Sequence, residues 1–253
     1  MTQSIDVKHV YYEYHTDRAD VLAIKDVSFS VAPSEFLCIV GPSGCGKTTI
    51  MNMLAGFLQP TEGEILIGEK PIDRHGQSQG VVFQDLAQLY PWRTVRRNVE
   101  FGLEMKGVDR KSRAQTADEF LHMVGLEKFA AAYPHQLSGG MQQRVAIARA
   151  LAYDPGVVLM DEPFAALDAM TRDSMQKLLS GIWQRTKKTI VYITHNVSEA
   201  TYLADKVLVL DPHPGTVKAE LSIDILRPRD LLSPAFVETQ RTILELLGKY
   251  DHQ

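Results

Sequence analysis

The sequence predicts an α/β fold with a mixed β-sheet, an inserted helical subdomain and an antiparallel β region at the N-terminus. Continuous apolar runs of strand length, which suit parallel strands covered on both faces, occur at residues 36–40, 157–161 and 189–194. Alternating apolar residues at 5–10 and 27–31 favour half-buried strands near the N-terminus. Between the first two apolar runs, the pattern from Val95 to Ala132 is mostly helical.

These elements are expected to form one domain of 253 residues. The α/β core is expected at about 1–85 and 155–225, and the helical subdomain at about 86–154. A helical tail is expected at about 226–253, with Ser233 as its cap, Pro234 in its first turn and Gly248 as its stop. The tail helix is expected to pack onto the body of the protein through its apolar residues Val237, Leu244 and Leu247.

Composition and charge narrow the class of protein. The chain is 45% hydrophobic and 23% charged, with a formal net charge of −4 and a pI of about 6.1. A general electrostatic attraction to nucleic acid is therefore not expected. No apolar run approaches the ~20 residues that cross a bilayer, and the first six residues lack the features of a secretory signal. The two cysteines, Cys38 and Cys45, are expected to be free thiols in a reducing cytosol.

One stretch matches the pattern G-x-x-x-x-G-K-[ST] without a mismatch: Gly41, Pro42, Ser43, Gly44, Cys45, Gly46, Lys47 and Thr48. An apolar run precedes it and helix-compatible spacing follows it, which is the context that a phosphate-binding P-loop requires. Gly44 and Gly46 can take backbone angles that turn successive N–H groups around a phosphate. The helix start adds unpaired N–H groups. Lys47 supplies a positive charge, and Thr48 supplies a hydroxyl that can bind Mg²⁺. The stretch predicts a P-loop nucleotide hydrolase or kinase.

Two features near the P-loop are weaker signals. The cluster Tyr11-Tyr12-Glu13-Tyr14 offers a ring that can stack on an adenine, although each tyrosine also suits an ordinary strand. Tyr14 is our choice because it ends the run where a loop is expected at 15–20. Gln84, at the end of a strand expected at 80–84, can reach Mg²⁺ or a water, although such a glutamine is usually only solvated.

A second anion-binding helix start is expected at Ser138-Gly139-Gly140. Ser138 is a natural N-cap, and the two glycines leave backbone N–H groups uncovered. The stretch that follows, residues 142–151, is rich in strong helix formers.

Candidate catalytic side chains follow two of the expected strands. Asp161 and Glu162 end the run at 157–161, where Asp161 can orient Mg²⁺ and Glu162 can activate a water for attack on a γ-phosphate. A tight loop then ends in Asp168. His195 follows the run at 189–194, at the end that parallel strands present to a ligand, and is expected to touch the γ-phosphate. The other seven histidines have no comparable context.

Taken in order from about Val7 to Leu247, these motifs resemble the ATP-binding subunit of an ABC transporter, a branch of the P-loop NTPases. The resemblance identifies 41–48 as Walker A, 137–141 as the signature and 157–161 as Walker B. It makes Glu162 the catalytic glutamate, and it assigns Gln84, Asp168 and His195 to the Q-, D- and H-loops. It implies that ATP is bound by Tyr14, Walker A, Thr49 and Gln84, and Mg²⁺ by Thr48, Gln84 and Asp161.

The resemblance also implies partners. Two copies of the chain would pair head to tail, with each ATP between one Walker A and the other copy's Ser138, Gly139, Gly140 and Met141. Transmembrane permease subunits would insert a cytoplasmic helix near residues 84–92, and a periplasmic or lipid-anchored solute-binding protein would act indirectly. The chain would lie peripherally on the cytoplasmic face of the inner membrane, and no nucleic acid is implied.

Within this family, the sequence most resembles the ATP-binding subunits of importers for nitrate, sulfonate, taurine and related small anions. The residues that carry this resemblance are 89–95, 98–99, 137–141 and 227–230. Subunits for thiamine-precursor and other uptake systems look similar. Three positions depart from the common pattern: Met141 for glutamine, Ala165 for serine or glycine, and Ser34 for a turn glycine. If that turn needs a left-handed backbone, the serine costs about 1 kcal/mol. None of the three touches Lys47, Asp161, Glu162 or His195, so an active ATPase is expected.

Two other classes compete with the importer ATPase. A soluble ABC ATPase acting on DNA or ribosomes usually carries long coiled-coil insertions, a second ABC domain or a basic arm, and none is evident in this sequence. A metabolic P-loop kinase gains nothing from a second anion-binding helix, and the signature, Glu162 and His195 together speak against it.

Overall fold

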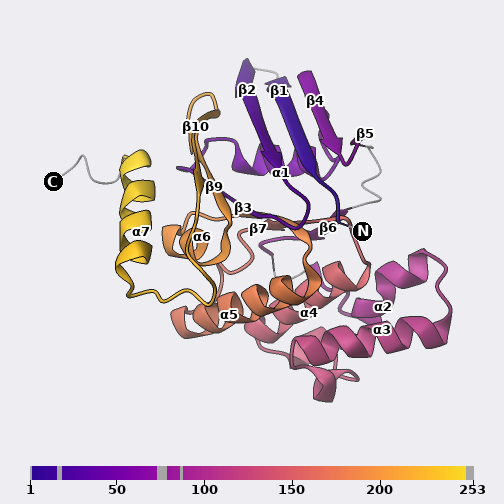
Figure 1. The fold of residues 1–253 in the computed structure, drawn as a ribbon. Coiled ribbons are helices and arrows are strands. Elements are labelled where there is room, and N and C mark those ends of the chain that lie inside the picture. Colours follow the sequence, from indigo (N-terminus) through magenta and orange to yellow (C-terminus); the bar gives the residue numbers. More distant parts are fainter. Residues whose placement is uncertain (1, 16–18, 73–78, 86–87, 249–253) are drawn as a thin grey trace. The chain divides into compact units, whose positions relative to one another are not determined.

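The computed structural model describes residues 2–15, 19–72, 79–85 and 88–248, which form two compact units (Figure 1). The helical unit comprises residues 79–187, and the P-loop unit comprises residues 2–72 and 188–248. The helical unit is wider than the subdomain expected at 86–154, whose first two residues lie outside the described residues. The bounds of that subdomain stay a prediction.

The predicted N-terminal antiparallel region is a four-stranded sheet in the order β2-β1-β4-β5. Its strands are β1 (Ile5–His15), β2 (Asp20–Val31), β4 (Glu62–Ile67) and β5 (Lys70–Pro71). The alternating apolar residues of β1 and β2 are buried, and Val7 lies opposite Phe29 in the antiparallel ladder. Burial of one face of this sheet is what the period of two predicts.

The second sheet of the P-loop unit contains β10-β9-β3-β8. Strands β3 (Phe36–Val40) and β8 (Thr189–Ile193) are buried at every position and run parallel, as do β3 and β9 (Lys206–Asp211). Strand β10 (Thr216–Ser222) returns antiparallel to β9, so this sheet is mixed. The predicted α/β fold with a mixed sheet is confirmed.

Three helices belong to the P-loop unit: α1 (Lys47–Leu54), α6 (Val197–Leu203) and α7 (Pro234–Leu246). Ser233 caps α7 by accepting a hydrogen bond from the backbone N–H of Phe236, as predicted. Of the residues predicted to pack α7 onto the body, Leu244 and Leu247 are half-buried, but the prediction for Val237 is wrong. Val237 is 44% exposed, whereas Phe236 and Ile243 are buried, and α7 lies beside α6 (Figure 1). Residues 236 and 243 are seven positions apart and therefore share one face of the helix, whereas residue 237, the next in sequence after 236, points to a different face.

The helical unit holds two parallel strands, β6 (Gln79–Val82) and β7 (Val157–Asp161). Its helices are α2 (Val95–Met105), α3 (Arg110–Met123), α4 (Gly139–Ala152) and α5 (Ala169–Thr186), with short 3₁₀ turns at Glu127–Phe129 and Pro134–Gln136. Gly125 has a φ of +69° just beyond α3, as expected for the residue that stops a helix. The helices predicted between 95 and 132 are therefore present.

Ser34 has a φ of +67°, so the turn before β3 does use the left-handed backbone that favours glycine. Its N–H donates to the hydroxyl of Thr189 at 3.0 Å, and that hydroxyl donates to the carbonyl of Gln3 at 2.7 Å. These contacts tie the strained turn to the start of β8.

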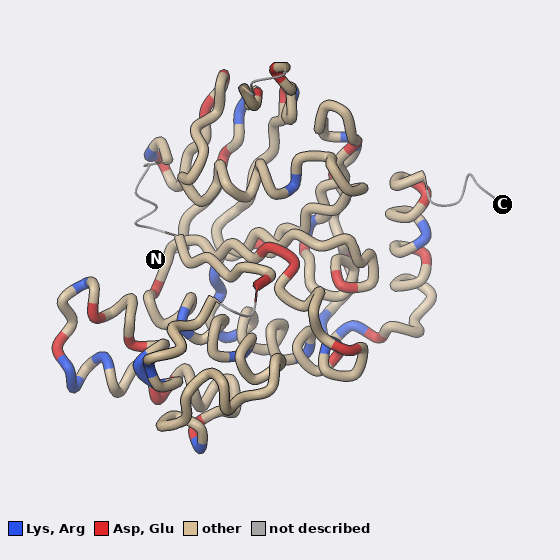
Figure 2. Tube along the Cα trace, turned by 180° about the vertical axis from the view of Figure 1, so that it is seen from behind, with Lys and Arg blue, Asp and Glu red and all other residues tan. Residues whose placement is uncertain are grey.

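Charges of both signs are spread along the chain (Figure 2), in agreement with the small net charge. No helix within the described ranges has the length and apolar character needed to cross a bilayer. Cys38 and Cys45 are buried free thiols, as predicted.

Candidate functional site

The P-loop joins the end of β3 to the start of α1. Gly44 and Gly46 have φ angles of +80° and +88°, the left-handed conformation expected from the sequence. A Cβ on Gly41 would lie 2.6 Å from the sulfur of Cys45 and 3.0 Å from the carbonyl oxygen of Leu210. Glycine is therefore required at the start of the loop by space and at its two later positions by backbone angle. Helix α1 begins at Lys47 itself, so its first N–H groups face the loop.

Lys47 is buried, and its ammonium group is held by the loop that precedes it. Its Nζ donates to the carbonyl oxygens of Gly41 at 2.8 Å and Pro42 at 2.9 Å, and lies 3.7 Å from the sulfur of Cys45. Burial raises the pKa of the Cys45 thiol, so this sulfur stays protonated at neutral pH. The loop therefore carries one fixed positive charge beside the N-terminus of α1.

Tyr14 is the tyrosine of its cluster that reaches α1. Its hydroxyl lies 3.2 Å from the Oγ1 of Thr49, and its ring meets the ring of Tyr12 edge-on at 4.8 Å. Tyr14 as a whole residue is 38% exposed, so it is partly accessible to a ligand. Strand β1 continues to His15, and residues 16–18 of the predicted loop lie outside the described residues.

His195 lies two residues beyond β8 and is exposed. The N–H of its neighbour Thr194 donates to the carbonyl of Ile39 in β3 at 3.3 Å, so this segment is tied to the strand that leads into the P-loop. On the other side, Asn196 caps α6. The P-loop unit thus brings Tyr14, residues 41–49 and His195 to the carboxyl ends of β3 and β8.

In the helical unit, the predicted acidic residues and Gln84 share one sheet edge. Val82 of β6 pairs with Met160 of β7, so Gln84 and Asp161 follow the same end of the two parallel strands. Gln84 lies two residues past the strand rather than in it, and it is exposed. Glu162 has a φ of +42°, an uncommon conformation for a non-glycine residue that clusters at functional sites.

Two residues missed in the sequence hold the segment that contains Gln84. The side chain of Gln88 accepts from the N–H of Phe83 at 3.2 Å and donates to its carbonyl at 2.9 Å. Arg149 of α4 donates to the carbonyl of Gln88 at 2.7 Å and to its side-chain oxygen at 3.4 Å. Burial lowers the pKa of Arg149. No local pattern marks either residue, because the contact joins positions 61 residues apart.

The start of α4 is built as the sequence predicts. The hydroxyl of Ser138 accepts a hydrogen bond from the N–H of Met141 at 3.4 Å, and α4 begins at Gly139. A Cβ on Gly140 would lie 2.7 Å from the methyl group of Thr171 in α5. The carboxylate of Asp168 caps α5 by accepting from the N–H of Thr171 at 3.0 Å, and hydrogen bonds there lower its pKa. The glycine-rich helix start therefore lies close to the first turn of α5, which Asp168 caps.

The residues predicted to bind Mg²⁺ offer suitable donor atoms. Thr48 supplies a hydroxyl, Gln84 an amide oxygen and Asp161 a carboxylate, and Mg²⁺ prefers oxygen ligands. Among the residues that the structure describes, no group of three His, Cys, Asp or Glu side chains is arranged to hold a metal. A magnesium ion held by one carboxylate, a hydroxyl and substrate phosphates needs no such group.

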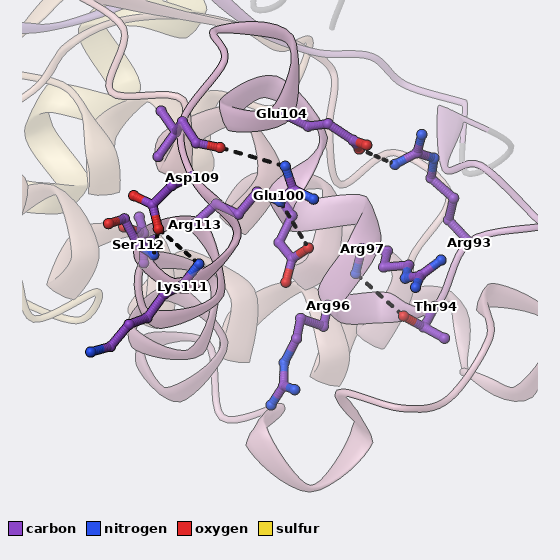
Figure 3. Close-up of polar contacts among 12 residues, drawn as sticks. Arg93, Thr94, Arg96, Arg97, Glu100, Glu104, Asp109, Lys111, Ser112 and Arg113 are labelled. Atoms are coloured by element: carbon purple, nitrogen blue, oxygen red, sulfur yellow. Dashed lines mark hydrogen bonds and ion pairs between the residues drawn. The ribbon is translucent and has the colours of Figure 1, made fainter.

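The helical unit also contains a charged pocket of about 670 Å³. We call it the arginine pocket, and it is lined by Trp92, Arg93, Thr94, Arg96, Arg97, Glu100, Glu104, Arg110, Arg113, Ala114, Ala130 and Ala131 (Figure 3). Five arginines thus face two glutamates. Trp92 at its edge is 72% exposed, which is unusual for so large an apolar side chain.

Three of these arginines have acidic partners. Arg93 donates to Glu104 at 2.6 Å, which lowers the pKa of that carboxyl, and the Nε of Arg113 lies 3.7 Å from Glu100 (Figure 3). Arg96 pairs with Asp118 at 2.8 Å. Arg97 and Arg110 form no ion pair within the described part of the chain. The pocket therefore carries more positive than negative charge.

Comparisons with known proteins agree with this site. A family profile described as "ABC transporter" matches residues 24–165. An ABC transporter ATP-binding protein of Methanocaldococcus jannaschii is 52% identical over 93% of this chain and 87% of its own length. The taurine import ATP-binding protein of Pelagibacter ubique is 45% identical over 92% and 90% of the two chains. The nitrate import ATP-binding protein of Synechocystis sp. is 48% identical over 82% of this chain and 78% of its own length.

The fold is also found among solved structures. A dimeric ATP-binding cassette in a post-hydrolysis state, bound to ADP and Pi, superposes with a TM-score of 0.73. It is 34% identical in sequence, and the match covers 88% of this chain and all of that one. A profile that spans more than half of the chain, together with relatives near 50% identity over almost its full length, settles the family. This chain belongs to the ABC transporter family and is one of its ATP-binding ATPases.

Proposed function

We propose that this ATPase binds Mg-ATP at residues 41–49 and powers an importer of a small anion. The observation that carries the proposal is the P-loop itself, with Gly44 and Gly46 in left-handed conformations at the start of a helix that begins with Lys47. Such a loop directs backbone N–H groups, a helix dipole and one ammonium group at phosphate oxygens. Tyr14 contributes the ring that stacks on the adenine, and its contact with Thr49 supports this choice.

In this proposal the acidic edge of the helical unit performs the hydrolysis. Thr48, Gln84 and Asp161 hold Mg²⁺, which neutralises charge on the phosphates when it is bound. Glu162 accepts a proton from the attacking water, and His195 donates a hydrogen bond to the γ-phosphate. Ser138, Gly139, Gly140 and Met141 bind the ATP of a second copy paired head to tail, and Asp168 lies next to that contact. The dimeric state of the solved relative supports this pairing.

Two variants test this assignment. Glu162→Gln should keep ATP binding, lose turnover and accumulate an ATP-bound dimer, measured by phosphate release and size-exclusion chromatography. Lys47→Ala should lose ATP binding itself, because it removes the charge at the loop. If Glu162→Gln hydrolyses ATP at the wild-type rate, Glu162 is not the catalytic base.

The partner in this proposal is a membrane permease. Its cytoplasmic helix enters near residues 84–92, of which 86–87 lie outside the described residues, and it meets the adjoining arginine pocket. Tryptophan and arginine are among the residue types enriched at protein interfaces. The chain would then sit peripherally on the cytoplasmic face of the inner membrane, with a periplasmic or lipid-anchored binding protein acting through the permease.

A pull-down of the tagged chain from detergent-solubilised membranes of its own cell tests the partner. Mass spectrometry should identify a multi-span permease. The double variant Arg97→Glu/Arg110→Glu should lose most of that permease, because both reversed charges lie in the arginine pocket. Lys111→Glu is the matched control, since Lys111 is exposed on α3 but does not line the pocket. Equal recovery with the double variant and the control would exclude the pocket as the docking surface.

The cargo is proposed to be a small anion such as nitrate, a sulfonate or taurine. Support comes from the relatives named for taurine and nitrate import. The binding protein that belongs with the captured permease can be titrated with these three ligands by calorimetry. A soluble ABC ATPase acting on DNA or ribosomes is the alternative, and the import proteins among the relatives do not favour it. Recovery of ribosomal or DNA-bound proteins without any permease would revive it.

A further inference from the structure

His213 lies at the same sheet edge as the P-loop, although the two are far apart in sequence. Strand β9 runs parallel to β3, and Val209 pairs with Val40, the last residue before the loop. The turn that follows β9, residues 212–215, therefore emerges beside the turn that follows β3. In parallel sheets, ligands bind where such turns meet.

Backbone contacts hold the turn in this place. The N–H of Gly215 donates to the carbonyl of Ala23 at 2.9 Å, and its carbonyl accepts from the N–H of Lys25 at 3.0 Å. A Cβ on Gly215 would lie only 2.3 Å from the carbonyl oxygen of Cys45 in the P-loop. The turn is therefore fixed between β2 and the P-loop, with no room for a larger residue at its end.

The imidazole of His213 lies against the tip of the P-loop. Its Cε1 is 3.5 Å and its Nε2 is 4.0 Å from the position that a Cβ would take on Gly44. His213 is exposed and has a φ of +58°, which is rare and costly for a residue with a side chain. Within the described residues its ring forms no hydrogen bond or ion pair. A strained, exposed polar side chain beside a ligand loop points to a role with the ligand.

We propose that His213 binds the phosphate chain of the nucleotide, as a side-chain donor added to the backbone donors of the P-loop. This inference rests on the proposed binding of Mg-ATP at residues 41–49. An imidazole N–H can donate to a phosphate oxygen, and hydrogen bonds to charged groups are the stronger class. The contact is made with bound nucleotide before and during hydrolysis alike, so it contributes to affinity rather than to the chemical step.

The test replaces His213 with glycine in the full chain and measures the Kd of Mg-ATP and Mg-ADP by calorimetry. Glycine removes the ring and also relieves the left-handed backbone, so the fold should not suffer. We expect both Kd values to rise about tenfold, the usual loss for one hydrogen bond to a charged group. The KM for ATP should rise by a similar factor while kcat stays within about twofold. His213→Arg should restore most of the affinity, because it again supplies a donor.

His9→Gly is the matched control. His9 is also an exposed histidine with positive φ, +48°, and it pairs with Asp26 on the N-terminal sheet. This variant should leave both Kd values unchanged. An unchanged Kd in His213→Gly, or a fall in kcat at constant KM, would overturn the inference. Failure of the wild type to bind Mg-ATP, or undiminished binding by Lys47→Ala, would instead overturn the proposed function on which it rests.

Discussion

Replacement of Gly215 by alanine should show how closely the turn after β9 packs on the P-loop. The added Cβ would lie 2.3 Å from the carbonyl oxygen of Cys45 and 3.1 Å from that of Ala23. An ordinary carbon–oxygen contact is about 3.3 Å or longer, so the turn must move by about 1 Å. Both neighbouring atoms belong to the backbone and cannot rotate away.

The cost can be worked out from the contacts that this movement disturbs. The two hydrogen bonds of Gly215, with Ala23 and Lys25, contribute about 1 kcal/mol each. Overpacking adds about 1–2 kcal/mol, so a total near 3–4 kcal/mol is expected. At 2–4 °C for each kcal/mol, the melting temperature of the P-loop unit should fall by roughly 6–16 °C.

Scanning calorimetry of the full chain measures this effect, and Gly181→Ala provides the control. Gly181 lies inside α5, and a Cβ there would meet nothing within 4 Å. Alanine should therefore stabilise this helix by about 0.5–1 kcal/mol, the ordinary difference in helix propensity. The reasoning is refuted if Gly215→Ala melts at the wild-type temperature, or if both alanine variants shift the melting temperature in the same direction.

Three further outcomes follow from single contacts. Tyr14→Ala should weaken ATP binding far more than Tyr11→Ala in a calorimetric titration, and equal losses would mean that the wrong ring was chosen. Arg149→Lys should lower the ATPase rate by about tenfold with little change in KM, because the side chain loses one of its two hydrogen bonds to Gln88. A wild-type rate would exclude a role for Arg149 in holding the segment that contains Gln84. Arg229→Leu should destabilise the fold by about 3 kcal/mol in a urea titration, since it strands buried carbonyl groups, and an unchanged midpoint would contradict that account.

The P-loop could be predicted because all its signals are local. The apolar strand, the glycines that need left-handed angles and the start of α1 fall within 19 residues, 36–54. Helix ends were predicted for the same reason. Ser138 and Ser233 accept hydrogen bonds from residues three positions ahead, and Gly125 takes the left-handed angle just past α3. A cap is a contact between neighbours in sequence, so its chemistry is visible there.

The packing of short or peripheral helices could not be predicted in the same way. Helix α6 has only seven residues, too few for a clear period, and its Glu199 is buried among hydroxyls of β8 and the residue after it. Tyr192 and Thr194 donate to that carboxylate at 3.0 and 2.7 Å. For α7, the buried face depends on where α6 lies, and an apolar Val237 gives no warning that it will be exposed.

Residues 227–230 show how a motif can be recognised for one reason and used for another. In the sequence they indicate a branch of importers. In the structure, Arg229 donates to the carbonyls of Thr201 and Tyr202 near the end of α6, and Arg227 donates to that of Leu203. These arginines satisfy carbonyl groups that a helix C-terminus leaves without partners. Their role in the fold is to fasten the start of the tail to α6.

His213 makes the same point for function. In the sequence it is one of seven histidines without context, because 169 positions separate it from Gly44. Its context comes from strand order: β9 neighbours β3, so the turn after β9 reaches the P-loop. Strand order depends on long-range pairing that no local period encodes. Sequence motifs therefore identify the part of a ligand site that follows a single strand. A residue that a neighbouring strand supplies can be identified only from the three-dimensional structure of the sheet.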